Sequence, residues 1–271
     1  MRPEDEARMA SALKHLRSLV SRQADPSVIM LNEMTEGDLT LIKQADWVRQ
    51  DYNITDASTV HWASPAYGTT MLVHRSLPIK SVFRVHYERT GMQRDALCVD
   101  IALPQGQTLR VATSHLESLK RDPPLRPSQL ATAAKYLHED GVYAGIIGGD
   151  FNAIEDFDRT LHVGNNLNDA YLESGGVEDA EEGMTWGQMA GRSQRQRFGL
   201  SRMDKIMFCG RVELVGFERF GMGVQVEDEG AAQQLLEGTD LERPWVTDHL
   251  GVKAQFRIES PETVGENRAG K

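Results

Sequence analysis

Cysteine, excess positive charge and long apolar runs are all scarce in this chain of 271 residues. The two cysteines, Cys98 and Cys209, sit in apolar segments, which argues against a disulfide framework or a cysteine zinc site and favours a reducing, intracellular setting, nuclear or cytoplasmic. A formal net charge of −10 argues against a general basic surface for duplex DNA, although it is compatible with a small basic groove. The charged start MRPEDEARM has no signal-peptide core, and no apolar run reaches membrane-spanning length. We therefore expect an intracellular monomer without a membrane partner.

Apolar periodicity predicts short strands with helices between them. An apolar stripe at helical spacing predicts a helix over residues 4–20, and similar spacing predicts helices from Asp38 to about Trp47 and over 128–138. Residues 173–199 are predicted to form a long irregular loop. Apolar runs predict strands at 28–31, 69–74, 96–103, 109–116, 143–149, 204–209, 212–220 and 249–258.

No linker or internal repeat divides the chain. The simplest interpretation is one α+β domain over residues 1–257, built as two packed β-sheets with helices on the outside. The polar residues 258–271 are predicted to be a disordered tail.

Several predicted strands end in polar side chains that a folded core does not need. Because strand ends converge at one edge of a sandwich, these residues are expected to meet in space. They are Glu33, His115, Ser118, Asp150, Asn152, Asp204, Asp248 and His249.

Each of these residues also has a purely structural explanation. Asp150 and Asn152 are typical of an Asx turn, and a lone histidine such as His115 is more often a hydrogen-bonded core residue than a ligand. Asp204 is suitably placed to pair with Arg202, and Glu33 would complement a helix dipole. Residues 248–249 would serve as a strand cap.

The segment AGIIGGDFNAIEDFD, residues 144–158, contains the sharpest of these signals. We interpret Gly148 and Gly149 as room for backbone close to a phosphate and a metal. Asp156 and Asp158, further along, are interpreted as surface acids.

Taken together, the acids, the amide and the two imidazoles favour phosphoryl transfer assisted by a hard cation. Carboxylate oxygens suit Mg²⁺ or Mn²⁺, and such an ion offsets charge on the phosphate. A carboxylate can orient a water, and a histidine held by a second carboxylate can stabilise the phosphoryl oxygens or the leaving group.

At these positions the chain resembles the endonuclease/exonuclease/phosphatase superfamily, which has the DNase I-like fold. The resemblance covers about residues 28–256, with matching segments in the family's order. The segment TSHLES and the Thr-Trp pair in MTWGQ resemble the tyrosyl-DNA phosphodiesterase branch. The other matching segments are VIMLNEMTE, QRDALCVDI, GGDFN, RMDKIMF and TDHLGV.

The resemblance implies a role for each matching residue. Glu33 is implied to bind the metal, with Asp248 near it. Asp150 is implied to position the attacking water, Asn152 to steady the transition state, and His249 to contact the scissile phosphate with Asp204 behind it. His115, Ser118 and Lys120 are implied to contact phosphate oxygens. Trp186 is implied to form an apolar wall for the substrate, and a core tryptophan is the equally weighted alternative.

The sequence departs from the family pattern at three places. The family's opening strand ends in Trp-Asn, and this chain begins at the helix that follows it, so we expect a fold without that strand and a site without that Asn. Lys120 stands where the relatives carry Arg, which retains the charge but not the bidentate geometry. Ile154 also stands where an Arg is expected.

The resemblance predicts a divalent-metal-dependent phosphodiesterase, with a 5′-phosphotyrosyl linkage at a DNA end as one substrate. A catalytically weak family member that serves as a binding module, and an enzyme for a small phosphoester, are the alternatives. Arg192, Arg195 and Arg197 would either contact a nucleic-acid backbone or belong to a solvated loop, and the general weakness of short charge runs favours the loop.

Overall fold

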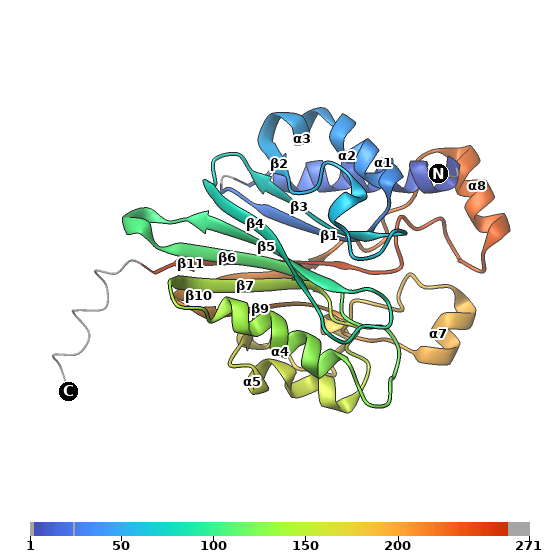
Figure 1. The fold of residues 1–271 in the computed structure, drawn as a ribbon. Helices are drawn as coiled ribbons and strands as arrows, with labels where there is room; N and C mark the ends of the chain where they lie inside the picture. The colour runs from blue at the N-terminus through green and yellow to red at the C-terminus, as the bar shows by residue number, and fades with distance from the viewer. Residues whose placement is uncertain (1–2, 24, 260–271) are drawn as a thin grey trace.

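A six-stranded sheet forms the centre of the computed structural model, which describes residues 3–23 and 25–259 (Figure 1). Its strand order is β4-β5-β6-β7-β9-β8, and only β6 and β7 are parallel neighbours among these pairs. The strands are β4 (Ile79–His86), β5 (Asp95–Ala102), β6 (Thr108–Ser114), β7 (Val142–Asp150), β9 (Asp204–Gly210) and β8 (Asn168–Asp169). Most of the predicted tail, residues 260–271, lies outside the described residues.

Two smaller sheets pack side by side on one face of the central sheet. The first has the order β1-β3-β2, with β1 at Val28–Met34, β3 at Gly68–His74 and β2 at Tyr52–Ile54. The second pairs β10 (Val212–Phe220) with β11 (Gly251–Ile258). An apolar cluster joins β3 to β5 and β6, and another joins β10 and β11 to β7 and β9. Leu109 on β6 packs against both clusters, so the two small sheets share one layer.

Helices cover both outer faces. Helices α1 (Pro3–Val20), α2 (Glu36–Gln44) and α3 (Asp46–Asp51) pack on the β1-β3-β2 sheet, while α4 (Arg126–Leu137) and α5 (Leu161–Gly164) pack on the far face of the central sheet. Helix α8 (Glu229–Gly238) lies against α1. The predicted α+β sandwich with helices outside is therefore confirmed as four layers. The remaining helices are α6 (Ala170–Glu173) and α7 (Arg192–Phe198), with 3-10 turns at Thr59–His61, Pro104–Gly106, Asp156–Thr160 and Glu181–Gly183.

Each of the two small sheets has an edge strand with one strand partner. Strand β1 pairs only with β3, and β11 pairs only with β10, among the residues described. The side chains of Asp25 and Gln255 bridge the two sheets at one end, with 3.0 Å between Gln255 Nε2 and Asp25 Oδ2. Among the residues described, the second layer is therefore split between β1 and β11.

Some elements differ from the sequence-based expectation. The helix predicted from Asp38 to Trp47 is two helices, because Ala45 between them has an extended backbone. The predicted loop over 173–199 contains α7. Strand β4 and helix α8 were not predicted, although Asp228, which accepts a hydrogen bond from Ala231 N, is a recognisable N-cap for α8.

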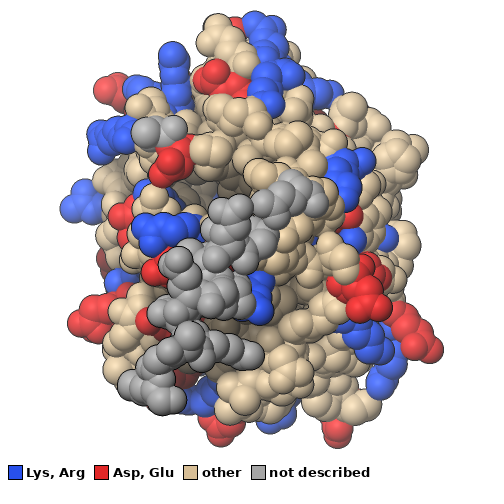
Figure 2. Space-filling model, turned by 90° about the vertical axis from the view of Figure 1, so that its left-hand side faces the viewer, with Lys and Arg blue, Asp and Glu red and all other residues tan. Residues whose placement is uncertain are grey.

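Two surface properties bear on function. No helix in the described part of the chain is long and apolar enough to cross a membrane. At the end of the molecule where β11 terminates, basic and acidic side chains are interspersed (Figure 2).

Candidate active site

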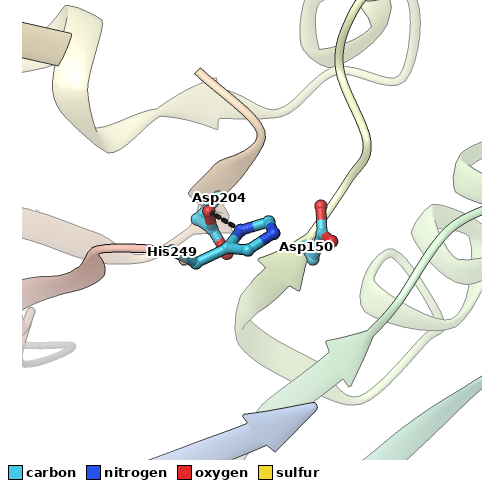
Figure 3. Close-up of side chains that lie close together, drawn as sticks. All are labelled: Asp150, Asp204 and His249. Carbon is cyan, nitrogen blue, oxygen red and sulfur yellow. Dashed lines mark hydrogen bonds and ion pairs between the residues drawn. The ribbon is translucent and has the colours of Figure 1, made fainter. Parts of the chain in front are cut away.

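Asp150, Asp204 and His249 meet at one edge of the central sheet (Figure 3). Asp150 is the last residue of β7 and Asp204 the first of β9, and these two residues are register partners in the antiparallel pair. His249 precedes β11, and the hydrogen bond from Leu250 N to Thr185 O ties that segment to the loop before β9. One carboxylate oxygen or imidazole nitrogen from each of the three side chains lies within 4.8 Å of the others. Distant parts of the sequence therefore form one polar cluster.

His249 is held by Asp204. Its Nδ1 lies 2.8 Å from Asp204 Oδ2, which leaves Nε2 on the side of Asp150. Burial lowers the pKa of His249, but the negative charge of Asp204 and the hydrogen bond to it raise the pKa more, to about 10. Burial raises the pKa of Asp204, and the imidazolium opposes that rise. At neutral pH His249 is therefore a cation with one N–H free to donate.

Asp150 is an ionised carboxylate in a buried position. Its Oδ1 accepts a hydrogen bond from Asn152 N at 2.8 Å, and Oδ2 lies 3.3 Å from His115 Nε2. Burial raises its pKa, but the hydrogen bond with His115 and the nearby positive charge of His249 outweigh burial and lower the pKa to about 2. The carboxylate is thus ready to accept a hydrogen bond from a water at neutral pH.

Arg94 lies directly behind His115, and the sequence analysis did not select it. Its Nη1 lies 2.5 Å from His115 Nδ1, and a guanidinium can only donate. His115 Nδ1 must therefore accept, which places the ring proton on Nε2, where it can be donated to Asp150. The signal was present in the sequence, because Arg94 stands in the segment QRDALCVDI immediately before a fully buried strand.

The guanidinium of Arg94 is buried and is not fully satisfied by the protein. Nη2 lies 3.3 Å from Ser118 Oγ, the Tyr67 ring lies 4.8 Å from the guanidinium carbon, and Nε has no hydrogen-bond partner. Arg94 and Tyr67 border a small recess of about 10 Å³, room for about one water, whose lining also includes Glu33 and His115. The buried guanidinium places a positive charge beside that recess and behind His115.

Three further predicted residues lie around this cluster. Glu33 lies within a register shift in β1, has a φ of 57°, and places Oε1 3.7 Å from His115 Nδ1, with 68% of its side chain exposed. Asn152 also has a positive φ and donates from Nδ2 to Leu116 O at 3.0 Å. Ser118 contacts Arg94, which in turn contacts His115. Each of the three residues therefore contacts Asp150 or His115, either directly or through one other residue.

Trp186 and Asp248 contact each other beside His249. Trp186 is buried, and its Nε1 donates to Asp248 Oδ2 at 3.0 Å. The Trp186 ring centroid lies 6.2 Å from that of Phe198, an exposed residue of α7. The Asp248 carboxylate therefore accepts a hydrogen bond from the indole. It is not part of the group formed by Asp150, Asp204 and His249.

Lys120 points away from the cluster. Its side chain is 72% exposed and pairs with Glu155 at 3.0 Å. The alternative pairing of Asp204 with Arg202 is wrong, because Arg202 pairs with Asp169 and Glu178, while Asp204 contacts His249.

Two interpretations of the segment 144–158 are also wrong. A Cβ on Gly149 would lie 2.1 Å from Ser114 O, and one on Gly148 would lie 2.8 Å from Met30 Sδ, so these glycines make room for neighbouring strands. Asp158 is buried and forms a bidentate pair with Arg126 at 2.9 and 2.7 Å, whereas Asp156 is fully exposed.

The donors of the cluster suit a hard divalent cation. Carboxylate oxygens of Asp150 and Asp204 lie close together, and the exposed Glu33 carboxylate lies 3.7 Å from His115, which itself contacts Asp150. Mg²⁺ and Mn²⁺ favour such oxygens and keep several waters, which an open edge allows. The chemistry of the residues present therefore fits the expected metal.

Comparisons with known proteins bear on the family and the fold. The sequence model of the Endonuclease/Exonuclease/phosphatase family matches residues 1–249. No curated protein matches this chain.

Solved structures with a similar fold include a humanized D. rerio TDP2 with 14 mutations, at a TM-score of 0.70 and 19% identity, covering 95% of this chain and 94% of that chain. D. rerio TDP2 complexed with a single-strand DNA product has a TM-score of 0.68 at 19% identity, covering 95% and 94%. The human Nocturnin catalytic domain with bound sulfate has a TM-score of 0.63 at 16% identity, covering 96% and 88%. At these identities the likeness concerns the fold.

Proposed function

This chain belongs to the Endonuclease/Exonuclease/phosphatase family, and on that premise we propose that it is a divalent-metal-dependent phosphodiesterase that cleaves its substrate by attack of water. The observation that carries the proposal is the convergence of Asp150, Asp204 and His249, with one donor atom of each within 4.8 Å of the others. An anionic carboxylate and a cationic imidazole side by side match what phosphodiester hydrolysis requires.

In this mechanism Asp150 orients the attacking water. A carboxylate with a pKa of about 2 is a weak base, so its contribution is to hold the water by a hydrogen bond and to stabilise the positive charge that develops on the water oxygen as it bonds to phosphorus. The bond from phosphorus to the leaving group breaks, and the proton that the water releases ends on the departing oxygen. The proton on His115 Nε2 and the amide of Asn152 keep the carboxylate in one orientation.

His249 donates to the phosphoryl group from Nε2. Its raised pKa maintains the cation at neutral pH, and Asp204 fixes the ring through Nδ1. Arg94 contributes a second positive charge from behind His115. Both cations stabilise negative charge that builds up on the phosphate oxygens.

Asp150, Asp204 and Glu33 are the residues that would hold Mg²⁺ or Mn²⁺ in this proposal. When bound, the ion would supply positive charge that stabilises the phosphate oxygens and the leaving group.

A nucleic-acid end is the substrate class that the surroundings favour. The exposed Phe198 ring, with the guanidinium carbon of Arg197 4.9 Å from its centroid, offers a surface on which a base can stack beside the buried Trp186. The similar D. rerio protein was solved with a single-strand DNA product, which supports the same choice. Within that class, a 5′ phosphate joined to a tyrosine is the first substrate to test.

The test is hydrolysis of bis(p-nitrophenyl) phosphate and of a 5′-tyrosyl oligonucleotide in Mg²⁺. We expect Asp150→Asn to lower kcat by at least about 100-fold, because the carboxylate that orients the water is lost. Asp156→Asn is the matched control, since Asp156 is fully exposed and should leave kcat unchanged. EDTA should abolish turnover, and Mg²⁺ or Mn²⁺ should restore it.

The outcome separates the alternatives. Turnover in D150N equal to that of the unmodified protein would remove Asp150 from the mechanism. Wild-type protein without metal-dependent turnover on any phosphodiester would favour the binding module instead. Turnover restricted to small phosphoesters, such as an inositol phosphate or a nucleotide, would retain the chemistry and reject the nucleic-acid substrate.

A further inference from the structure

Glu117 is a fully buried carboxylate two residues after His115, and no role has yet been assigned to it. Its exposed fraction is 0%. Four donors converge on its two oxygens: Thr90 Oγ1 and Gly91 N at 3.1 Å, Arg121 Nη2 at 3.3 Å and Gln129 Nε2 at 3.4 Å. A buried acid with this many donors holds several chain segments in one arrangement.

The contacts of Glu117 lead to Arg94 through one residue. Thr90 Oγ1 donates to Glu117 and accepts from Arg94 N at 2.8 Å. The approach at Gly91 is so close that a Cβ there would lie 2.8 Å from Glu117 Oε1. Glu117 thus fixes residues 90–94 against the loop that follows β6, and the backbone of Arg94 is part of that arrangement.

Arg94 in turn sets the proton on His115 and faces the recess. We propose that Glu117 is a positioning residue that acts through Thr90 to hold Arg94 against His115. Neither Glu117 nor Thr90 touches the substrate in this arrangement. The inference rests on the proposed function for its activity readout, since Arg94 matters to turnover only if the site hydrolyses a phosphodiester.

The first test is Glu117→Gln, which preserves the side-chain volume. The glutamine has one acceptor oxygen where the glutamate has two, and its NH₂ group would face some of the four donors that now bind the carboxylate. We expect kcat for bis(p-nitrophenyl) phosphate in Mg²⁺ to fall about 10- to 100-fold, the usual effect of removing a partner that orients a site residue. Asp100→Asn is the matched control. Asp100 is also buried and paired with an arginine, Arg110, but lies at the opposite end of β5, so this variant should lose stability and retain kcat.

A double-mutant cycle separates positioning from general destabilisation. If Glu117 acts through Arg94, E117Q should change kcat by less than about twofold in an Arg94→Ala background. If E117Q lowers kcat by the same factor with and without Arg94, the proposal is overturned.

Thr90 provides a second variant should E117Q fail to fold. Thr90→Val preserves the shape of a half-buried side chain and removes the hydroxyl between Glu117 and Arg94. We expect T90V to lower kcat as E117Q does, and Thr90→Ser, which retains the hydroxyl, to restore it to within about twofold of wild type. A T90V variant with unchanged kcat would overturn the inference.

Failure of the proposed function is distinguishable from failure of this inference. If the wild-type protein hydrolyses no phosphodiester, amide hydrogen exchange of the peptide spanning residues 88–95 tests whether Glu117 holds this segment in place. Faster exchange there in E117Q but not in D100N supports the positioning role, and unchanged exchange in E117Q rejects it.

Discussion

Replacing Asp158 with alanine should be one of the most destabilising single changes in the chain. Asp158 and Arg126 have exposed fractions of 3% and 2%, and the two oxygens of Asp158 accept from Arg126 Nε and Nη2 at 2.9 and 2.7 Å. In D158A the guanidinium stays buried with two carbonyl oxygens, those of Glu117 and Leu119, as its other acceptors. Leaving one partner of a buried pair uncompensated costs about 3–5 kcal/mol of unfolding free energy.

The loss should appear in both urea and thermal unfolding. At roughly 2–4 °C per kcal/mol for a chain of this size, Tm should fall by roughly 6–20 °C. Asp158 Oδ2 also accepts from Ile154 N and Glu155 N, so the loop that follows Asn152 loses its anchor, and kcat should fall as well. Asp156→Ala, two residues away and fully exposed, is the control and should unfold like wild type. Equal unfolding free energies for D158A and D156A would refute the buried ion pair.

Two further predictions concern the strand end and the pH dependence of stability. Gly149→Ala should unfold at much lower urea concentration than wild type, because its Cβ would lie 2.1 Å from Ser114 O. Gly238→Ala is the control: no atom lies within 4 Å of its Cβ, so its stability should match or exceed that of wild type. A G149A variant as stable as G238A would contradict the close approach. Burial lowers the pKa of His15 and of His162 below the ordinary 6.5, so near and below pH 6.5 these two side chains bind more protons in the unfolded chain than in the folded one. The two histidines therefore lower the unfolding free energy as the pH drops from 7.5 to 5.5, whereas His249, with its raised pKa, acts in the opposite direction. In urea titrations the H15Q/H162Q double variant should gain stability relative to wild type as the pH drops across that range.

The sequence by itself determined the fold class and the identity of the cluster. Apolar runs followed by polar residues are local patterns, and they predicted most of the central strands and the convergence of Asp150, Asp204 and His249. The α+β sandwich follows from the same patterns, because a sheet with apolar faces must be covered on both sides. Elements with weaker apolar patterns, such as β4 at the sheet edge, were missed.

Only the tertiary structure decided which contacts each polar residue makes. Asp156 and Asp158 look alike in the sequence, yet one is solvated and the other buried, because Arg126 reaches Asp158 from α4. Arg94 became recognisable once its contact with His115 was seen, and the role of Gly149 once the carbonyl of Ser114 was seen beside it. In each case the deciding partner lies 20 or more residues away along the chain, a distance at which local patterns carry no information about contact.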